Sequence, residues 1–395
     1  MITVQEALKI ILNNTQTFGV EEIPFLESVG RVLKENIEAD RDFPPFNRVS
    51  MDGIAINHRY FKQGIRDFTI EGIQAAGAEN KTMNNPSNCL EVMTGAVLPI
   101  NTDTVIRYED VNIKNGIATI TEDKLELGKN IHSQGKDQRQ GDVLIEKNKI
   151  ISAAEIGVIA SVGKTLVKVS ILPKVMIVST GDELVEVHET PLSHQIRRSN
   201  VFTLVSLLEK LNIKADISHI TDKKELLKEK IAYFLKEYDV LLFSGAVSKG
   251  KFDFLPEVLD ELGVNKLFHR VAQRPGKPFW YGVKDNKSVF AFPGNPISTY
   301  VNCLVYFYPW FADSIGLEFK KETVILGEDF SFKPELTYFL QVKVENMDGN
   351  KIAFPVKGNG SGDLVSLVRA DGFIQLPKEK TTFKKGEIVI FIRYR

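Results

Sequence analysis

The stretch KVMIVSTGDEL, residues 174–184, decides the fold. Its first half is a short run of apolar and β-branched residues, which is typical of a strand buried on both faces of a sheet. Its second half ends that strand with a glycine and two carboxylates. Next, VFTLVSLLEKL at 201–211 has apolar residues at helical spacing. A buried strand followed by an amphipathic helix predicts a βαβ unit.

The same alternation continues towards the C-terminus. Further strands are predicted at KADISHI (214–220), YDVLLFS (238–244) and SVFAF (288–292). Helices are predicted at 222–237 with Asp222 as the N-cap, at 254–262, and at 296–308, which Pro296 opens. We therefore expect an open parallel sheet with helices on both faces.

The segments on either side of this α/β region have different patterns. The first 14 residues predict an amphipathic helix. Short alternating runs between 66 and 150 predict a β-rich module, and 152–163 predicts a helix with a Ser152–Glu155 capping box. Beyond about 317, alternating runs predict a small β-barrel or sandwich. The chain is thus expected to be multidomain, α/β plus β.

Composition excludes several classes of protein. The 395 residues exceed one ordinary core, and the net charge of −1 offers no general excess of positive charge for a nucleic acid. Cys89 and Cys303 lie too far apart in sequence for a Cys-x-x-Cys pair, so a reducing cytoplasm is expected. No apolar run approaches the length of a membrane span.

Common catalytic motifs are also missing from the sequence. The six histidines show neither i, i+4 pairing nor clustering with cysteine, so zinc is not expected. No Gly-x-Ser-x-Gly elbow and no Walker-type loop occurs, which argues against hydrolases and P-loop enzymes.

Ligands of open parallel sheets bind beyond the carboxyl ends of the strands, where loops meet helix N-termini. In this chain those loops are TGDEL (180–184), GAVSKGKFD (245–253) and PGNP (293–296). Small residues let a backbone approach a phosphate closely. The candidates are Gly245, Ser248 and Gly250. A tight turn without any ligand would use the same residues.

Charged residues suggest what such a site could hold. Arg274 and Lys277 flank a stiff Pro-Gly turn and suit an oxyanion, although isolated surface charge is the simpler interpretation. Asp182 and Glu183 follow an apolar strand, a usual arrangement for Mg²⁺ beside a substrate phosphate. Helix capping explains Asp182 equally well, so Glu183 carries more weight.

Eight strings in this order are similar to the molybdopterin molybdenumtransferase family, known in bacteria as MoeA and in animals as the cofactor-synthesis end of gephyrin. They are PPFNRVSMDGIAI (44–56), VMTGAVLP (92–99), GKNIHSQGKD (128–137), STGDEL (179–184), SGAVSKGKFD (244–253), RPGKP (274–278), FPGNP (292–296) and GNGSGDLVSLVRADGFIQLP (358–377). The resemblance covers nearly the whole chain, and the ordered set is highly specific.

The resemblance implies an N-terminal linker domain (about 1–22 and 140–172) that carries a β-rich insert (about 23–139). An α/β molybdopterin-binding domain (173–316) and a C-terminal β-barrel (317–395) would follow. It also implies an elongated homodimer, with the active site between the α/β domain of one subunit and the insert of the other. Other proteins of the cofactor pathway are possible further partners.

The implied reaction brings molybdate to the dithiolene sulfurs of adenylated molybdopterin while AMP leaves, with Mg²⁺ and cations offsetting the repulsion between anions. The residues expected to be catalytic are Asp52, Asp137, Glu183, Asp253 and Lys277. Those expected to bind substrate are Thr94, Asp182, Asp239, Gly245, Ser248, Gly250, Arg274, Pro293, Pro296 and Ser366. Glu183 and Asp182 are the expected metal ligands.

The chain departs from the family pattern at four positions. Ala246 replaces a usual glycine, Arg274 a common lysine, and Asn47 a frequent aspartate, while Gln341 stands where the barrel often offers an arginine. Two other functions remain open: a molybdopterin adenylyltransferase-like enzyme, which shares the α/β domain, and a non-catalytic dimeric scaffold. The insert and barrel favour the molybdenumtransferase, and binding of AMP or molybdopterin would distinguish an enzyme from a scaffold.

Overall fold

The structure is a computed structural model, and it describes the whole chain except residues 246 and 248–252. The chain divides into two compact units. The main unit comprises Met1–Lys34, Asn148–Ile151 and Lys168–Arg395, and the insert unit comprises Glu35–Lys147 and Ser152–Val167. The finer division into four domains stays a prediction.

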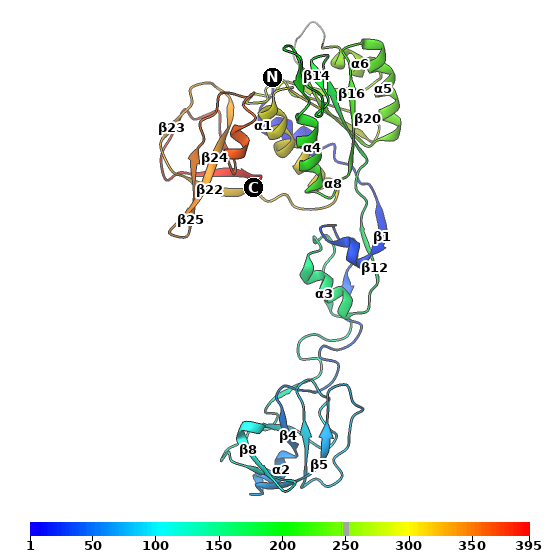
Figure 1. The fold of residues 1–395 in the computed structure, drawn as a ribbon, viewed down its shortest axis with the longest axis vertical. Helices are drawn as coiled ribbons and strands as arrows, with labels where there is room; N and C mark the ends of the chain where they lie inside the picture. The colour runs from blue at the N-terminus through cyan, green and yellow to red at the C-terminus, as the bar shows by residue number, and fades with distance from the viewer. Residues whose placement is uncertain (246, 248–252) are drawn as a thin grey trace. The chain divides into compact units, whose positions relative to one another are not determined.

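A six-stranded sheet forms the centre of the main unit (Figure 1). Its order is β16 (Ala215–Ile220), β13 (Val175–Thr180), β17 (Val240–Ser244), β21 (Lys287–Phe292), β20 (Trp280–Lys284) and β18 (Asn265–His269). The first four strands are parallel, as predicted. β20 is antiparallel to both of its neighbours, β21 and β18, so the expectation of a wholly parallel sheet is wrong on this side. Only Asp285 and Asn286 separate β20 from β21, and so short a loop can join only antiparallel neighbours.

Helices cover both faces of this sheet. On one face α1 (Val4–Leu12), α4 (Asn200–Glu209), α7 (Pro296–Asn302) and α8 (Tyr308–Ser314) share one hydrophobic core with the strands. The π-helical turn η3 (Cys303–Phe307) joins α7 to α8. On the other face α5 (Lys224–Glu237) and α6 (Leu255–Glu261) share a second core. The sheet is therefore buried on both sides, as its apolar strands require.

Five C-terminal strands close into a barrel, which confirms the predicted C-terminal β-barrel. They are β24 (Thr337–Met347), β25 (Asn350–Pro355), β22 (Glu322–Leu326), β28 (Ile388–Arg393) and β26 (Gly372–Leu376), and β26 pairs back with β24. The short β19 (Gln273–Arg274) adds to β24 in parallel. That pairing attaches the RPGKP turn of the α/β region to the barrel. Smaller barrel elements are β23 (Phe330–Ser331), β27 (Thr382–Phe383) and α9 (Ser366–Arg369).

The insert unit contains its own six-stranded sheet. The order is β7 (Thr104–Arg107), β4 (Gly53–Ile56), β6 (Cys89–Val92), β5 (Asp67–Gln74), β9 (Ile117–Ile120) and β8 (Val111–Lys114). Two short antiparallel pairs accompany it, β3 (Arg48–Val49) with β10 (Ile131–His132) and β2 (Ile37–Glu38) with β11 (Val143–Ile145). The helices are α2 (His58–Lys62) and α3 (Ala153–Ser161). The predicted Ser152–Glu155 capping box is present at the start of α3.

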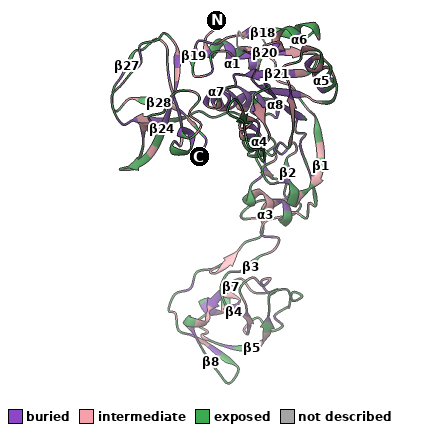
Figure 2. Cartoon of the chain, turned by 45° about the horizontal axis from the view of Figure 1, so that its top comes forward, coloured by how far each residue is buried: buried purple, intermediate pink, exposed green. Residues whose placement is uncertain are grey.

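Buried residues lie mainly along the strands and on the facing sides of the helices (Figure 2). There are two further small pairs: β14 (Leu184–Val185) with β15 (Ile196–Arg197) in the main unit, and β1 (Val20–Pro24) with β12 (Leu166–Ser170), a strand that begins in the insert unit and ends in the main unit. Within the described ranges, no helix has both the length and the apolar character needed to cross a membrane.

Candidate active site

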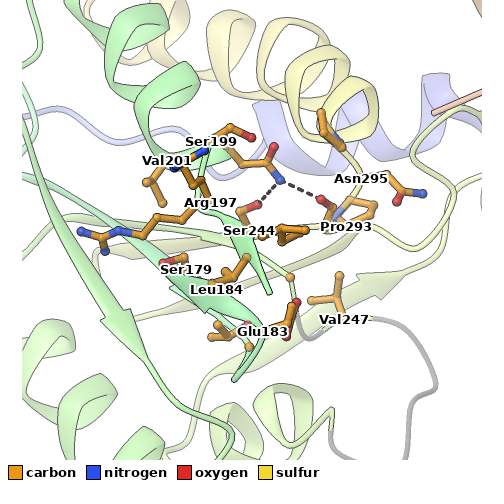
Figure 3. A pocket seen from close by; sticks show the side chains of 18 of the residues that line it. Ser179, Glu183, Leu184, Arg197, Ser199, Val201, Ser244, Val247, Pro293 and Asn295 are labelled. Atoms are coloured by element: carbon orange, nitrogen blue, oxygen red, sulfur yellow. Dashed lines mark hydrogen bonds between the residues drawn. The ribbon is translucent and has the colours of Figure 1, made fainter. Parts of the chain in front are cut away.

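The three loops that follow β13, β17 and β21 meet at a cavity of about 460 Å³, which we call the strand-end cavity (Figure 3). These are the loops that the sequence singled out. Its described lining consists of Ser179–Gly181, Glu183, Leu184, Ile196–Val201, Asp222, Ser244, Gly245, Val247, Asp253, Pro278 and Pro293–Pro296. Among the predicted residues it therefore contains Glu183, Gly245, Asp253, Pro293 and Pro296. The register of the parallel strands places these loop starts side by side.

Neutral polar groups form one wall of the strand-end cavity. Asn200, the first residue of α4, donates through Nδ2 to Ser244 Oγ at 2.9 Å and to the Gly294 carbonyl at 2.7 Å. These bonds tie the loops after β17 and β21 to one helix N-terminus. Ser179 adds a hydroxyl, whose oxygen lies 3.0 Å from His219 Nδ1. Such groups can orient a polar ligand without adding charge.

Three carboxylates also line the strand-end cavity: those of Glu183, Asp222 and Asp253. Partial burial raises the pKa of Asp222, and the negative charges of Asp182, Glu183 and Asp253 raise it further. The sequence assigned Asp222 to the cap of a helix, but α5 begins at Lys224, Lys223 is its N-cap residue, and Asp222 faces the cavity instead. Its position after β16, the strand beside β13, could have revealed it.

The carboxylates suit Mg²⁺ by type, because magnesium prefers oxygen ligands and binds through one or two carboxylates together with substrate phosphates. As placed in the described part of the chain, no three His, Cys, Asp or Glu side chains form a ready metal site. Two carboxylates and a substrate would therefore be the fitting arrangement, with Glu183 and Asp222 as the chain's contribution. Asp182 is exposed, does not line the cavity, and accepts a hydrogen bond from the Asp222 N–H at 3.0 Å.

A second cavity of about 480 Å³, the turn cavity, lies between the RPGKP turn and the barrel. Its lining includes Arg274, Lys277, Ser298, Gln341 and Ser361. The two cavities share Pro278, Pro293 and Asn295 as a common wall. The predicted carboxylates and the predicted cations thus line adjoining spaces in one unit.

Charge in the turn cavity comes from the turn itself. The Arg274 guanidinium lies over the rings of Phe332 and Tyr338, at 5.7 and 5.5 Å from their centres. Lys277 is exposed, and no carboxylate of the described residues pairs with it. Both cations are therefore available to an incoming anion.

Gln341 also lines the turn cavity, although its amide nitrogen is buried. The residue is 7% exposed, and its Nε2 has no hydrogen-bond partner among the described residues. Its Oε1 accepts from the Ser366 hydroxyl at 3.0 Å. Ser366 is fully buried and also bonds the Asp363 carbonyl, so it lies behind Gln341 and does not line the cavity. In the structure its hydroxyl supports Gln341, and its contact with substrate stays a prediction.

The remaining predicted residues of the insert lie in the insert unit. Asp52 Oδ1 accepts the Thr94 N–H at 2.6 Å, and this hydrogen bond lowers the pKa of Asp52. Asp137 Oδ1 lies 2.7 Å from His132 Nε2. His132 belongs to β10, which pairs with β3 shortly before Asp52. All three predicted residues are thus held in fixed local contacts.

Asp239 lies far from both cavities, so its predicted substrate contact is not supported by its position. It precedes β17 and accepts from the Lys174 N–H at 2.9 Å, with Lys287 Nζ at 3.5 Å. Five strand residues at about 3.3 Å each separate it from the cavity end of β17. Its carboxylate organises the opposite edge of the sheet. Ser248, Gly250 and Ala246 lie outside the described residues.

The main unit combines a doubly covered α/β sheet, a polar cavity at its strand ends and a C-terminal barrel, and the comparisons assign the α/β part to a class of molybdopterin-binding domains. The model of a probable molybdopterin binding domain matches residues 176–312. Models of the MoeA N-terminal region (domain I and II) and the MoeA C-terminal region (domain IV) match residues 2–163 and 323–394. The chain belongs to the molybdopterin molybdenumtransferase (MoeA) family, a family of transferases in molybdenum cofactor biosynthesis.

Relatives of known name are similar over their full length. A molybdopterin molybdenumtransferase of Synechocystis is 42% identical, with 99% of each chain covered. One of Staphylococcus epidermidis is 31% identical, covering 98% of this chain and 94% of the relative. The crystal structure of the molybdopterin biosynthesis MoeA protein from Pyrococcus horikoshii OT3 has a TM-score of 0.85 at 27% identity, with 100% of both chains covered.

Proposed function

We propose that this chain inserts molybdenum into molybdopterin, taking adenylated molybdopterin and molybdate as substrates and releasing AMP. The observation that carries the proposal is the shared wall of the two cavities, Pro278, Pro293 and Asn295. The strand-end cavity offers carboxylates, neutral donors and the side chains of Arg197 and Arg198, and the turn cavity offers Arg274 and Lys277. A substrate bound in the strand-end cavity can therefore lie next to a different substrate bound in the turn cavity.

In this proposal the strand-end cavity holds the nucleotide-linked pterin. Gly245 and the N-terminus of α4 let backbone approach a pyrophosphate. Glu183 and Asp222 would hold Mg²⁺, which when bound neutralises charge on the phosphate oxygens. Asn200 and Ser244 orient the ligand through neutral hydrogen bonds.

The turn cavity holds molybdate as the second substrate. Arg274 and Lys277 offset its negative charge, and Gln341 lines the same cavity. Little nucleophilic work by side chains is needed: the dithiolene sulfurs bind the molybdenum as one molybdate oxygen leaves as water with the two thiol protons, and a water molecule cleaves the pyrophosphate bond to release AMP. The chain contributes by holding two anions close together and in register.

Asp52, Thr94 and Asp137 would act from the insert of a second copy in a homodimer. Their contacts within the insert unit are already formed, so they offer a preorganised surface. This part of the proposal predicts that the two copies complete each site together.

Reconstitution tests the proposal directly. Purified adenylated molybdopterin, molybdate and the chain are mixed, and cofactor formed is measured by activation of an apo-molybdoenzyme. Glu183→Ala and Asp52→Ala should abolish activation while the protein stays folded, whereas Glu229→Ala, an exposed carboxylate on α5, should leave it unchanged. Full activity of Glu183→Ala would exclude the site. Transfer of AMP from ATP to molybdopterin would instead identify an adenylyltransferase.

A further inference from the structure

A network of buried polar side chains contacts the RPGKP turn. Gln273 is 1% exposed, and Asn302 and Tyr306 are 0% exposed. They lie among the aromatic residues of the main core, where Tyr306 and Phe279 have ring centres 4.7 Å apart. Buried polar groups in such a core are stable only when their hydrogen bonds are satisfied.

The hydrogen bonds of this side-chain network all run in one direction, from Tyr306 towards the RPGKP turn. The Tyr306 hydroxyl donates to Gln273 Oε1. Gln273 Nε2 then donates to Asn302 Oδ1 at 2.7 Å and to the Pro275 carbonyl at 2.9 Å. Asn302 Nδ2 donates to the Gly276 carbonyl at 3.4 Å. The network therefore ends on two consecutive carbonyls of the turn.

Two members of the network, Asn302 and Tyr306, come from one helical segment. Asn302 ends α7, and Tyr306 lies four residues later in the π-helical turn η3, so both face the same side. Single π-helical turns inside α-helices occur frequently at functional sites. Here the π-helical turn η3 joins α7 to α8.

Gly276 shows how closely the network fits the turn. Its φ is +88°, and a Cβ there would lie 2.6 Å from Asn302 Oδ1 and 2.8 Å from Gln273 Nε2. Only glycine leaves room for both amides. The backbone on either side of Gly276 is thereby held directly against the buried network, and this backbone carries Arg274 and Lys277.

We propose that Gln273, Asn302 and Tyr306 are positioning residues that fix the cationic turn and so set the geometry of the anion subsite. None of the three lies among the residues expected from the sequence, and only Gln273 borders the turn cavity. The anion subsite rests on the proposed function, but the fixing of the turn does not. Arg274 and Lys277 both belong to the RPGKP turn, so greater mobility of that turn would displace both cations.

Two variants remove the network while keeping the core filled: Tyr306→Phe and Asn302→Leu. The matched control is Tyr281→Phe, since Tyr281 is also 0% exposed in the same aromatic core and its hydroxyl lies 3.4 Å from Ser288 Oγ, away from the turn. Amide hydrogen exchange over residues 271–279 is measured in the ligand-free protein. Molybdate affinity is then measured by calorimetry, with molybdate alone as the probe.

Both network variants should exchange faster over 271–279 and bind molybdate about tenfold more weakly, while Tyr281→Phe matches the unchanged protein. In cofactor formation the KM for molybdate should rise and kcat at saturation should hold. Equal exchange in all four proteins would overturn the proposal, as would a normal KM with a lowered kcat. If the network variants exchange faster but the unchanged protein binds no molybdate, the role of the network is supported and only the anion subsite is refuted.

Discussion

Replacing Gly276 with alanine should destabilise the main unit by about 3 kcal/mol. Positive φ costs an L-residue roughly 1–2 kcal/mol. The added Cβ would also meet Asn302 and Gln273 atoms at 2.6–2.9 Å, all closer than real Cβ contacts allow. Displacing those amides leaves a buried donor or acceptor unsatisfied, at about 1–3 kcal/mol.

Gly386→Ala separates the two contributions. Gly386 has nearly the same backbone, φ +90°, with nothing within 4 Å of a Cβ, so only the cost of the backbone conformation of about 1–2 kcal/mol applies. Urea unfolding is followed by tryptophan fluorescence, since both tryptophans, Trp280 and Trp310, lie in the cores of the main unit. Equal losses of stability in the two variants would refute the claim that a buried network presses against the turn.

Three further predictions concern separate parts of the chain. Gln341→Arg adds a cation to the turn cavity and should tighten molybdate binding by about tenfold with a steeper salt dependence; an unchanged Kd in calorimetry would contradict the anion subsite. Asp222→Asn should raise the melting temperature at pH 7. The folded protein raises the pKa of Asp222, so that carboxyl's contribution to stability is complete below its ordinary pKa and is lost as pH rises through the raised value. The increase in melting temperature caused by Asp222→Asn should therefore vanish near pH 3. An equal increase at pH 7 and pH 3 would argue against charge repulsion. Ser152→Ala removes the capping box of α3 and should cost about 1 kcal/mol, measured as faster amide exchange in α3.

The sequence predicted the α/β region well because its strands and helices have clear periodicity. The apolar run before TGDEL formed β13, and the three glycine-rich loops met at one cavity. The strands β20 and β18 on one side of the sheet were missed, since WYGVK and NKLFH do not alternate cleanly. The loop of Asp285 and Asn286 was the available sign of a hairpin.

Site residues were harder to predict, because a carboxylate's role depends on which end of a strand it occupies. Asp239 precedes β17 and therefore lies at the opposite edge of the sheet, whereas Asp222 follows β16 and reaches the cavity. The buried network was invisible in sequence. Asn302 and Tyr306 interrupt an apolar helix without any motif, and only packing shows that they meet Gln273.

Molybdate is proposed to bind in the turn cavity, next to Pro278, Pro293 and Asn295, which also line the strand-end cavity. Anomalous diffraction at the molybdenum edge, from crystals soaked in molybdate, tests it most directly. A single peak within contact of Arg274 and Lys277 is the predicted result. A peak among Glu183, Asp222 and Asp253 with the turn cavity empty would contradict it.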